Sequence, residues 1–124
     1  MSSAELKNDQ LDFNETIKEL QFSSGLDVLI MDMEGNVKAS KLKYGKLDGI
    51  NKIIVETIEK TRKVAESFST GRFEECIVCG KNGYTIVKTS DSHILVVSGL
   101  TEHQLGLALH KLRQVANNLS TSLE

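Results

Sequence analysis

The hydrophobic period of this 124-residue chain changes in a fixed order, and that order limits the folds open to it. Apolar residues first recur at helical spacing, then alternate as in strands, return to helical spacing, alternate again and end at helical spacing. The intervening segments are short, which leaves little length for a cofactor loop or a catalytic insertion. We expect a single domain over residues 1–124, with an ordered core over about residues 4–119.

Eight elements fit this pattern, and polar or glycine-containing turns separate them. Asp48 or Asn51 is expected to cap the long central helix, and T-E-H-Q at 101–104 has the form of a capping box that starts the last helix. The expected helices span residues 4–22, 50–68 and 101–119, and the expected strands span residues 26–33, 37–42, 73–80, 84–89 and 93–98.

Tight turns between the strands predict a five-stranded antiparallel sheet, which places the chain in the α/β (α+β) class. The strand at 26–33 is apolar on both faces, so helices should cover both sides of the sheet. The long helix should cross one face while the terminal helices share the other. Val55 departs from the broad apolar stripe of the long helix and turns toward its polar side. That stripe comprises Ile50, Ile53, Ile54, Thr57, Ile58, Thr61, Val64, Ala65 and Phe68.

The charge balance excludes several classes of partner. The chain has 15 basic and 17 acidic residues and a net charge of −2, which argues against nucleic acid. Its apolar runs are too short for membrane insertion. The first residues, MSSAELKNDQ, lack the basic and apolar regions of an export signal, so the two cysteines indicate reduced thiols and a cytoplasmic location.

Four lysines, Lys38, Lys41, Lys43 and Lys46, cluster on the second expected strand and the loop that follows it. They could join cations of the long helix in a basic patch that binds anions. They could instead form a solvated sheet edge that lysines protect from aggregation. Acidic residues of the long helix offset its cations, so we favour the solvated edge.

Cys76 and Cys79 form a C-x-x-C-G-K sequence that is similar to a zinc knuckle. A structural zinc site needs four ligands, and the histidines at 93, 103 and 110 show no metal-ligand spacing. On one strand the two cysteines would also face opposite sides. We interpret them as small buried hydrophobes. A metal- or ligand-sensing module that uses Cys76, Cys79 and a histidine is the alternative function.

Signatures of catalysis are missing from the sequence. It has no G-x-S-x-G elbow and no G-x-x-x-x-G-K-[ST] phosphate loop. Asp91-Ser92-His93 is typical of a turn that enters a strand. We therefore expect no catalytic residues, no cofactor and no enzymatic activity.

The strand at 73–80 is expected at an open edge of the sheet; the alternative is that the order of the elements places it inside the sheet. Its alternation places Phe73, Glu75 and Ile77 on one face and Cys76 and Val78 on the other. An apolar edge with few lysines invites pairing with another chain, and twofold pairing of two copies covers it. A charged residue at Ile77, or proline at Cys76, should then give monomers.

Four short motifs occur in order along the chain: S-G-L, D-M-E-G-N-V, I-V-C-G-K-N-G-Y-T-I-V and G-L-T-E-H-Q-L-G-L-A-L-H-K-L. They lie before the first strand, at the first hairpin, at the second hairpin and at the start of the last helix. Together they resemble the roadblock / dynein-light-chain domain family from Phe13 to Leu119, a family similar to profilin-like folds. A short chain of this kind looks most like the prokaryotic members that regulate small GTPases.

The resemblance implies a non-enzymatic adaptor that binds a small Ras-like GTPase and modulates its activity or location. It also implies a homodimer, or a heterodimer with a related subunit, built through the long helix and the third strand. Arg62 or Arg72 could reach the GTPase as a finger. The implied dimer contacts are Ile53, Thr57, Phe73, Glu75, Cys76, Ile77 and Val78. The implied GTPase contacts are Val55, Glu59, Arg62, Lys63 and Glu66. The alternative for these charges is an ordinary solvated helix face.

Overall fold

The computed structural model describes residues 13–22, 25–101 and 103–122, with side chains described up to residue 119. Residues 13–20 are helical. They precede β1 (Asp27–Asp32), β2 (Val37–Lys41), α2 (Ile50–Ser67), β3 (Glu75–Cys79), β4 (Gly83–Thr89), β5 (His93–Leu100) and α3 (Leu105–Ser122). Residues 4–12 of the first expected helix, Glu102 of the expected capping box and residues 123–124 lie outside the described residues.

The five strands form one sheet in the order β2-β1-β5-β4-β3, and every neighbouring pair is antiparallel. β1 and β5 are central because their side chains are apolar on both faces. β3 lies at one edge of the sheet and β2 at the other. The predicted fold class and the predicted open edge at β3 are both confirmed.

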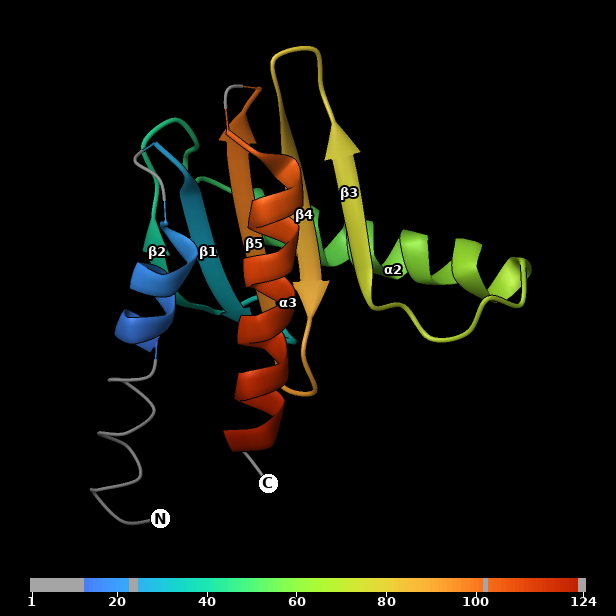
Figure 1. The fold of residues 1–124 in the computed structure, drawn as a ribbon. Helices are drawn as coiled ribbons and strands as arrows, with labels where there is room; N and C mark the ends of the chain where they lie inside the picture. The colour runs from blue at the N-terminus through green and yellow to red at the C-terminus, as the bar shows by residue number, and fades with distance from the viewer. Residues whose placement is uncertain (1–12, 23–24, 102, 123–124) are drawn as a thin grey trace.

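Helices cover both faces of the sheet, as predicted (Figure 1). The helix at 13–20 and α3 pack on one face, around a core that includes Leu20, Leu95 and Leu112. α2 crosses the other face, where Ile54 packs with Met31, Leu29, Val87, Ile94 and Val96. No helix in the described ranges combines the length and apolar character needed to cross a bilayer.

Two helix starts differ from the expectation. α2 begins after Gly49, which has φ 78°, and neither Asp48 nor Asn51 caps it. Asn51 instead donates a side-chain hydrogen bond to the carbonyl of Gly35 at 3.0 Å, because the β1–β2 turn lies beside the helix start. α3 begins at Leu105 rather than at Thr101, since β5 extends to Leu100 and the Thr101 N–H donates to the carbonyl of Asn82.

The orientation of Val55 was also predicted wrongly. Val55 is half-buried and packs against the core between α2 and the sheet. Its side chain also lies close to the β1–β2 turn: a Cβ added at Gly35 would be only 2.9 Å from Val55 Cγ2. The turn thus covers a helix face that helical periodicity alone leaves in solvent.

Candidate functional site

The open edge of β3 exposes unpaired backbone groups. Thr89 N–H donates to the carbonyl of Glu74 at 3.0 Å, and Gly80 N–H donates to the carbonyl of Gly83 at 2.8 Å. In an antiparallel ladder these bonds recur at every second residue, so residues 76 and 78 also bond toward β4. The N–H and C=O groups of Glu75, Ile77 and Cys79 therefore point outward, where a further strand can bond to them.

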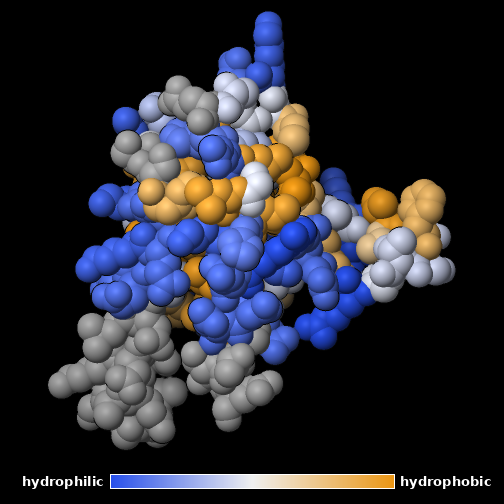
Figure 2. Space-filling view, viewed as in Figure 1, coloured by the Kyte–Doolittle hydropathy of each residue, from blue (hydrophilic) through white to orange (hydrophobic). Residues whose placement is uncertain are grey.

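The C-terminal half of α2 extends past β3 and has no sheet beneath it (Figure 1). Only Ile54 of α2 is fully buried, although the apolar stripe continues to Phe68. Phe68 is 76% exposed, and Ile53 and Val64 are also exposed. Hydrophobic atoms gather at this projecting end of the helix in Figure 2. We call the exposed apolar residues of this stripe and of the β3 edge the edge surface. It comprises Val64 and Phe68 at the projecting end, Ile53 in the first turn of α2, and Ile77 and Val78 on β3.

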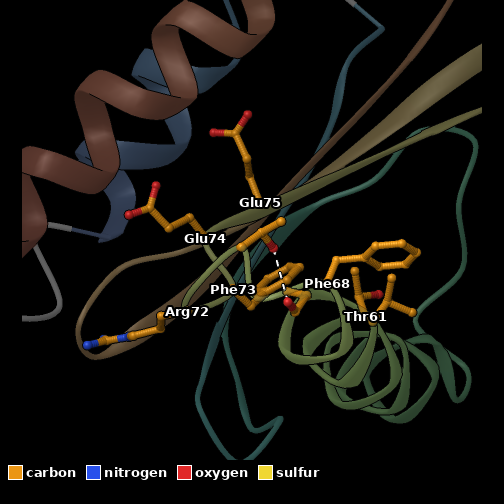
Figure 3. A pocket seen from close by; sticks show the side chains of 9 residues that line it. Thr61, Phe68, Arg72, Phe73, Glu74 and Glu75 are labelled. Carbon is orange, nitrogen blue, oxygen red and sulfur yellow. Dashed lines mark hydrogen bonds between the residues drawn. The ribbon is translucent and has the colours of Figure 1, made fainter.

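A hollow of about 610 Å³ lies between the C-terminal half of α2 and the chain that enters β3, and Val64, Phe68 and Glu75 are among the residues that line it. Figure 3 shows Thr61 of α2 and Phe68, which directly follows the helix, on one side of it and the chain that enters β3 on the other, with Phe73 between them. Thr70 Oγ1 donates to the carbonyl of Ala65 at 3.1 Å and so ties the connecting loop to the helix. Phe73, which was expected at the dimer interface, is buried within the single chain and supports this surface from beneath.

Glu75 fastens the β3 edge to α3. It accepts hydrogen bonds from Arg113 Nε at 2.9 Å and Nη2 at 2.6 Å, and Lys88 Nζ lies 3.6 Å from its carboxylate. The bidentate hydrogen bonds of Arg113 lower the pKa of Glu75, and the charge of Lys88 adds to the effect. Glu75 was expected at the dimer interface, and the structure directs its carboxylate to the α3 face.

The other expected interface residues lie as follows. Ile53, Ile77 and Val78 are exposed, while Thr57 and Cys76 are half-buried. Val78 is 51% exposed although it lies in a strand, so this face of the strand is uncovered in the single chain. The C-terminal half of α2 and the β3 edge lie at the same side of the molecule (Figure 1).

A second depression runs along the other side of α2, and we call it the charged groove. It measures about 490 Å³, and four of the five expected GTPase contacts, Val55, Glu59, Arg62 and Glu66, line it. Lys63 is exposed but does not line it. The groove also includes residues that were not expected at this contact: Met33 after β1, Ile58 of the α2 stripe, Asp91 in the β4–β5 turn and Ile94 at the start of β5.

Charges of both signs border this groove around an apolar floor. Arg62 donates to Glu59 one turn earlier on α2. Arg72 lies 3.7 Å from Asp91 in an exposed ion pair that bridges the α2–β3 and β4–β5 loops. Exposed ion pairs contribute little to stability, so their positions are free to serve binding. Such a mixture of apolar floor and charged rim is typical of protein-binding surfaces.

The cysteines offer no assembled metal site. Cys76 is half-buried and Cys79 is exposed, and both are free. The interpretation of the two cysteines as buried hydrophobes is therefore wrong for Cys79, because the end of the edge strand β3 is uncovered. Within the described ranges, no three His, Cys, Asp or Glu side chains come together in a way that could hold a metal ion. Their alternation on β3 directs the two thiols to opposite faces of the sheet.

Comparison with known proteins gives matches in structure. No family model matches the sequence, and no curated protein matches it. The gliding protein MglB from Thermus thermophilus superposes with a TM-score of 0.76 at 20% identity, over 98% of this chain and 92% of that one. The roadblock/LC7 domain from Streptomyces avermitilis gives 0.73 at 14% identity, over 86% and 92%. The chain has the roadblock/LC7 fold.

A profilin shares the roadblock architecture more distantly. Acanthamoeba castellanii profilin IA superposes with a TM-score of 0.69 at 12% identity, over 90% of this chain and 98% of that one. At such identities the likeness concerns the fold, as the resemblance to roadblock domains and their profilin-like relatives predicts. The roadblock fold by itself assigns no partner.

Proposed function

We propose that the protein is a dimeric, non-enzymatic adaptor that binds a small Ras-like GTPase in the cytoplasm. The observation that carries this proposal is the edge surface, where an unpaired strand and an uncovered apolar helix stripe lie side by side. One MglB structure is described as having a tetrameric arrangement, so self-association has a precedent among proteins of this fold.

Pairing two β3 strands covers both parts of the edge surface at once. An antiparallel pairing about a twofold axis opposes residues of like parity, so the two sheets continue with their faces matched. Both α2 helices then lie on the same face, where the stripe of one can pack against the other. Ile53, Val64 and Phe68 supply the apolar contact, and Ile77 supplies outward N–H and C=O groups.

The charged groove is the proposed GTPase contact. It stays outside the β3 edge, so a dimer presents two copies of it on its α2 face. Arg62 and Glu66 would meet charges of the GTPase, and Met33 and Ile58 would provide apolar contact. Any effect on GTP hydrolysis would come from ordering the switch segments of the GTPase, or from Arg62 or Arg72 acting as a finger.

The test is binding of purified small Ras-like GTPases from the same organism, loaded with GDP or a non-hydrolysable GTP analogue and measured by calorimetry. We predict that one of them binds, and that Arg62→Glu weakens binding by roughly tenfold or more because it reverses a charge in the groove. Lys60→Glu is the matched control on the same helix, since it makes the same charge change outside the groove. Equal loss with both variants, or binding by none of the GTPases, would contradict the proposal.

A further inference from the structure

The loop that joins β2 to α2 is held in one shape by a buried carboxylate. Asp27 is 7% exposed and accepts backbone hydrogen bonds from Lys43 at 2.6 Å, Tyr44 at 3.2 Å and Gly45 at 2.6 Å. Three successive N–H groups thus turn inward around one anion. The side chains of the loop are displayed on a fixed backbone as a result.

Those side chains include two exposed hydrophobic groups. Tyr44 is 55% exposed and Leu47 is 43% exposed. Lys43 Nζ lies 5.2 Å from the centroid of the Tyr44 ring, so a cation and an aromatic ring share the loop. A large hydrophobic side chain beside a lysine is suited to a boundary between water and an apolar phase.

The same segment carries a local positive charge that the net charge conceals. Residues 37–47 hold Lys38, Lys41, Lys43 and Lys46 and no acidic residue, while the whole chain is acidic. Lys38 lies 3.9 Å from Asp32 in an ion pair. Within the described ranges, Lys41, Lys43 and Lys46 are exposed and form no ion pair. These three exposed ammonium groups are therefore available to bind an anionic partner.

We propose that this basic loop, residues 41–47, docks the protein on the surface of a bilayer that contains anionic phospholipids. Lysine is a compact charge that suits phosphate headgroups, and tyrosine is enriched at membrane interfaces. A nucleic acid is the weaker candidate for the partner of this loop. An exposed leucine such as Leu47 neither stacks on bases nor contacts phosphates, and the loop contains no arginine. The docking is peripheral and independent of the proposed GTPase contact, which lies on α2.

The experiment is co-sedimentation with vesicles of phosphatidylcholine alone or with one quarter phosphatidylglycerol. We expect binding only to the anionic vesicles, and weaker binding as salt is raised, because salt screens the attraction. Each lysine that is neutralised by Lys→Gln at 41, 43 or 46 should lower the partition coefficient roughly fivefold. Tyr44→Ser with Leu47→Ser should reduce binding while leaving the charge unchanged.

Lys60→Gln with Lys63→Gln is the control, because it removes two exposed charges from α2 and keeps the loop intact. A fluorescence readout is available as well: the chain has two tyrosines and no tryptophan, and Tyr84 is buried. Protection of tyrosine fluorescence from acrylamide on vesicle binding would therefore report Tyr44. Equal binding to neutral vesicles, equal loss in the control, or loop-dependent binding to duplex DNA in place of vesicles would each overturn the proposal.

Discussion

At the scale of single residues, the ion pair between Glu75 and Arg113 links β3 to α3 and contributes to the stability of the folded chain. Glu75→Gln should lower the free energy of unfolding at pH 7 by about 1–2 kcal/mol, because Arg113 and the buried Lys88 lose their carboxylate. The pKa of Glu75 is lowered in the folded state, so its contribution is present above the unfolded pKa and disappears as pH falls.

Urea unfolding at pH 7 and pH 3 measures this difference at one protein concentration. Glu74→Gln is the control, since its side chain is exposed and should change stability by less than about 0.5 kcal/mol. A Glu75→Gln penalty that persists unchanged at pH 3 would show that the ion pair is not its cause.

Gly83 is a second residue with a specific structural requirement. It lies opposite Leu100 where β4 and β5 approach closely, and an added Cβ would lie 2.3 Å from the carbonyl oxygen of Gly99. Gly83→Ala should therefore destabilise the protein by about 2 kcal/mol, because backbone must move. Gly106→Ala meets nothing within 4 Å in α3 and should stabilise by about 0.5 kcal/mol. Thermal unfolding compares them, and equal shifts for both would refute the close approach.

At the scale of elements, the alternation of hydrogen bonds along β3 refines the variant that tests the edge. Cys76→Pro was expected from the sequence to give monomers. The N–H of Cys76 bonds toward β4, so this substitution removes a hydrogen bond within the sheet and should destabilise the folded chain itself. Ile77→Pro removes only the Ile77 N–H, which points away from β4, and edge strands tolerate proline at such a position. Gel filtration with circular dichroism should show a folded monomer for Ile77→Pro; a folded dimer would place the interface elsewhere.

The same elements show what sequence reasoning can and cannot predict. Period and turn chemistry predicted all five strands and the broad stripe of α2, because both depend on local spacing. The exposure of Val64 and Phe68 depends on where the sheet ends, which local spacing does not encode. Val55 was misplaced because the β1–β2 turn covers it, and that contact joins segments about twenty residues apart in the sequence.

Part of the candidate groove could also be predicted from the sequence. Glu59, Arg62 and Glu66, which line it, follow from the polar face of one helix. Met33, Asp91 and Ile94 join it only through the sheet topology, which brings the β1–β2 and β4–β5 turns beside α2. The ion-pair partner of Glu75 could not be predicted from local spacing either, because Arg113 lies on α3, 38 residues away in the sequence.

At the scale of the whole molecule, the proposed function depends on self-association through the edge surface. Sedimentation equilibrium of the unmodified chain from micromolar to millimolar concentration tests it most directly. We predict a species of twice the 13.7 kDa chain mass that Val64→Glu reduces to a single folded chain, because a charge would enter the apolar contact. A mass of 13.7 kDa at every concentration, or a dimer that Val64→Glu and Ile77→Pro both leave intact, would contradict it.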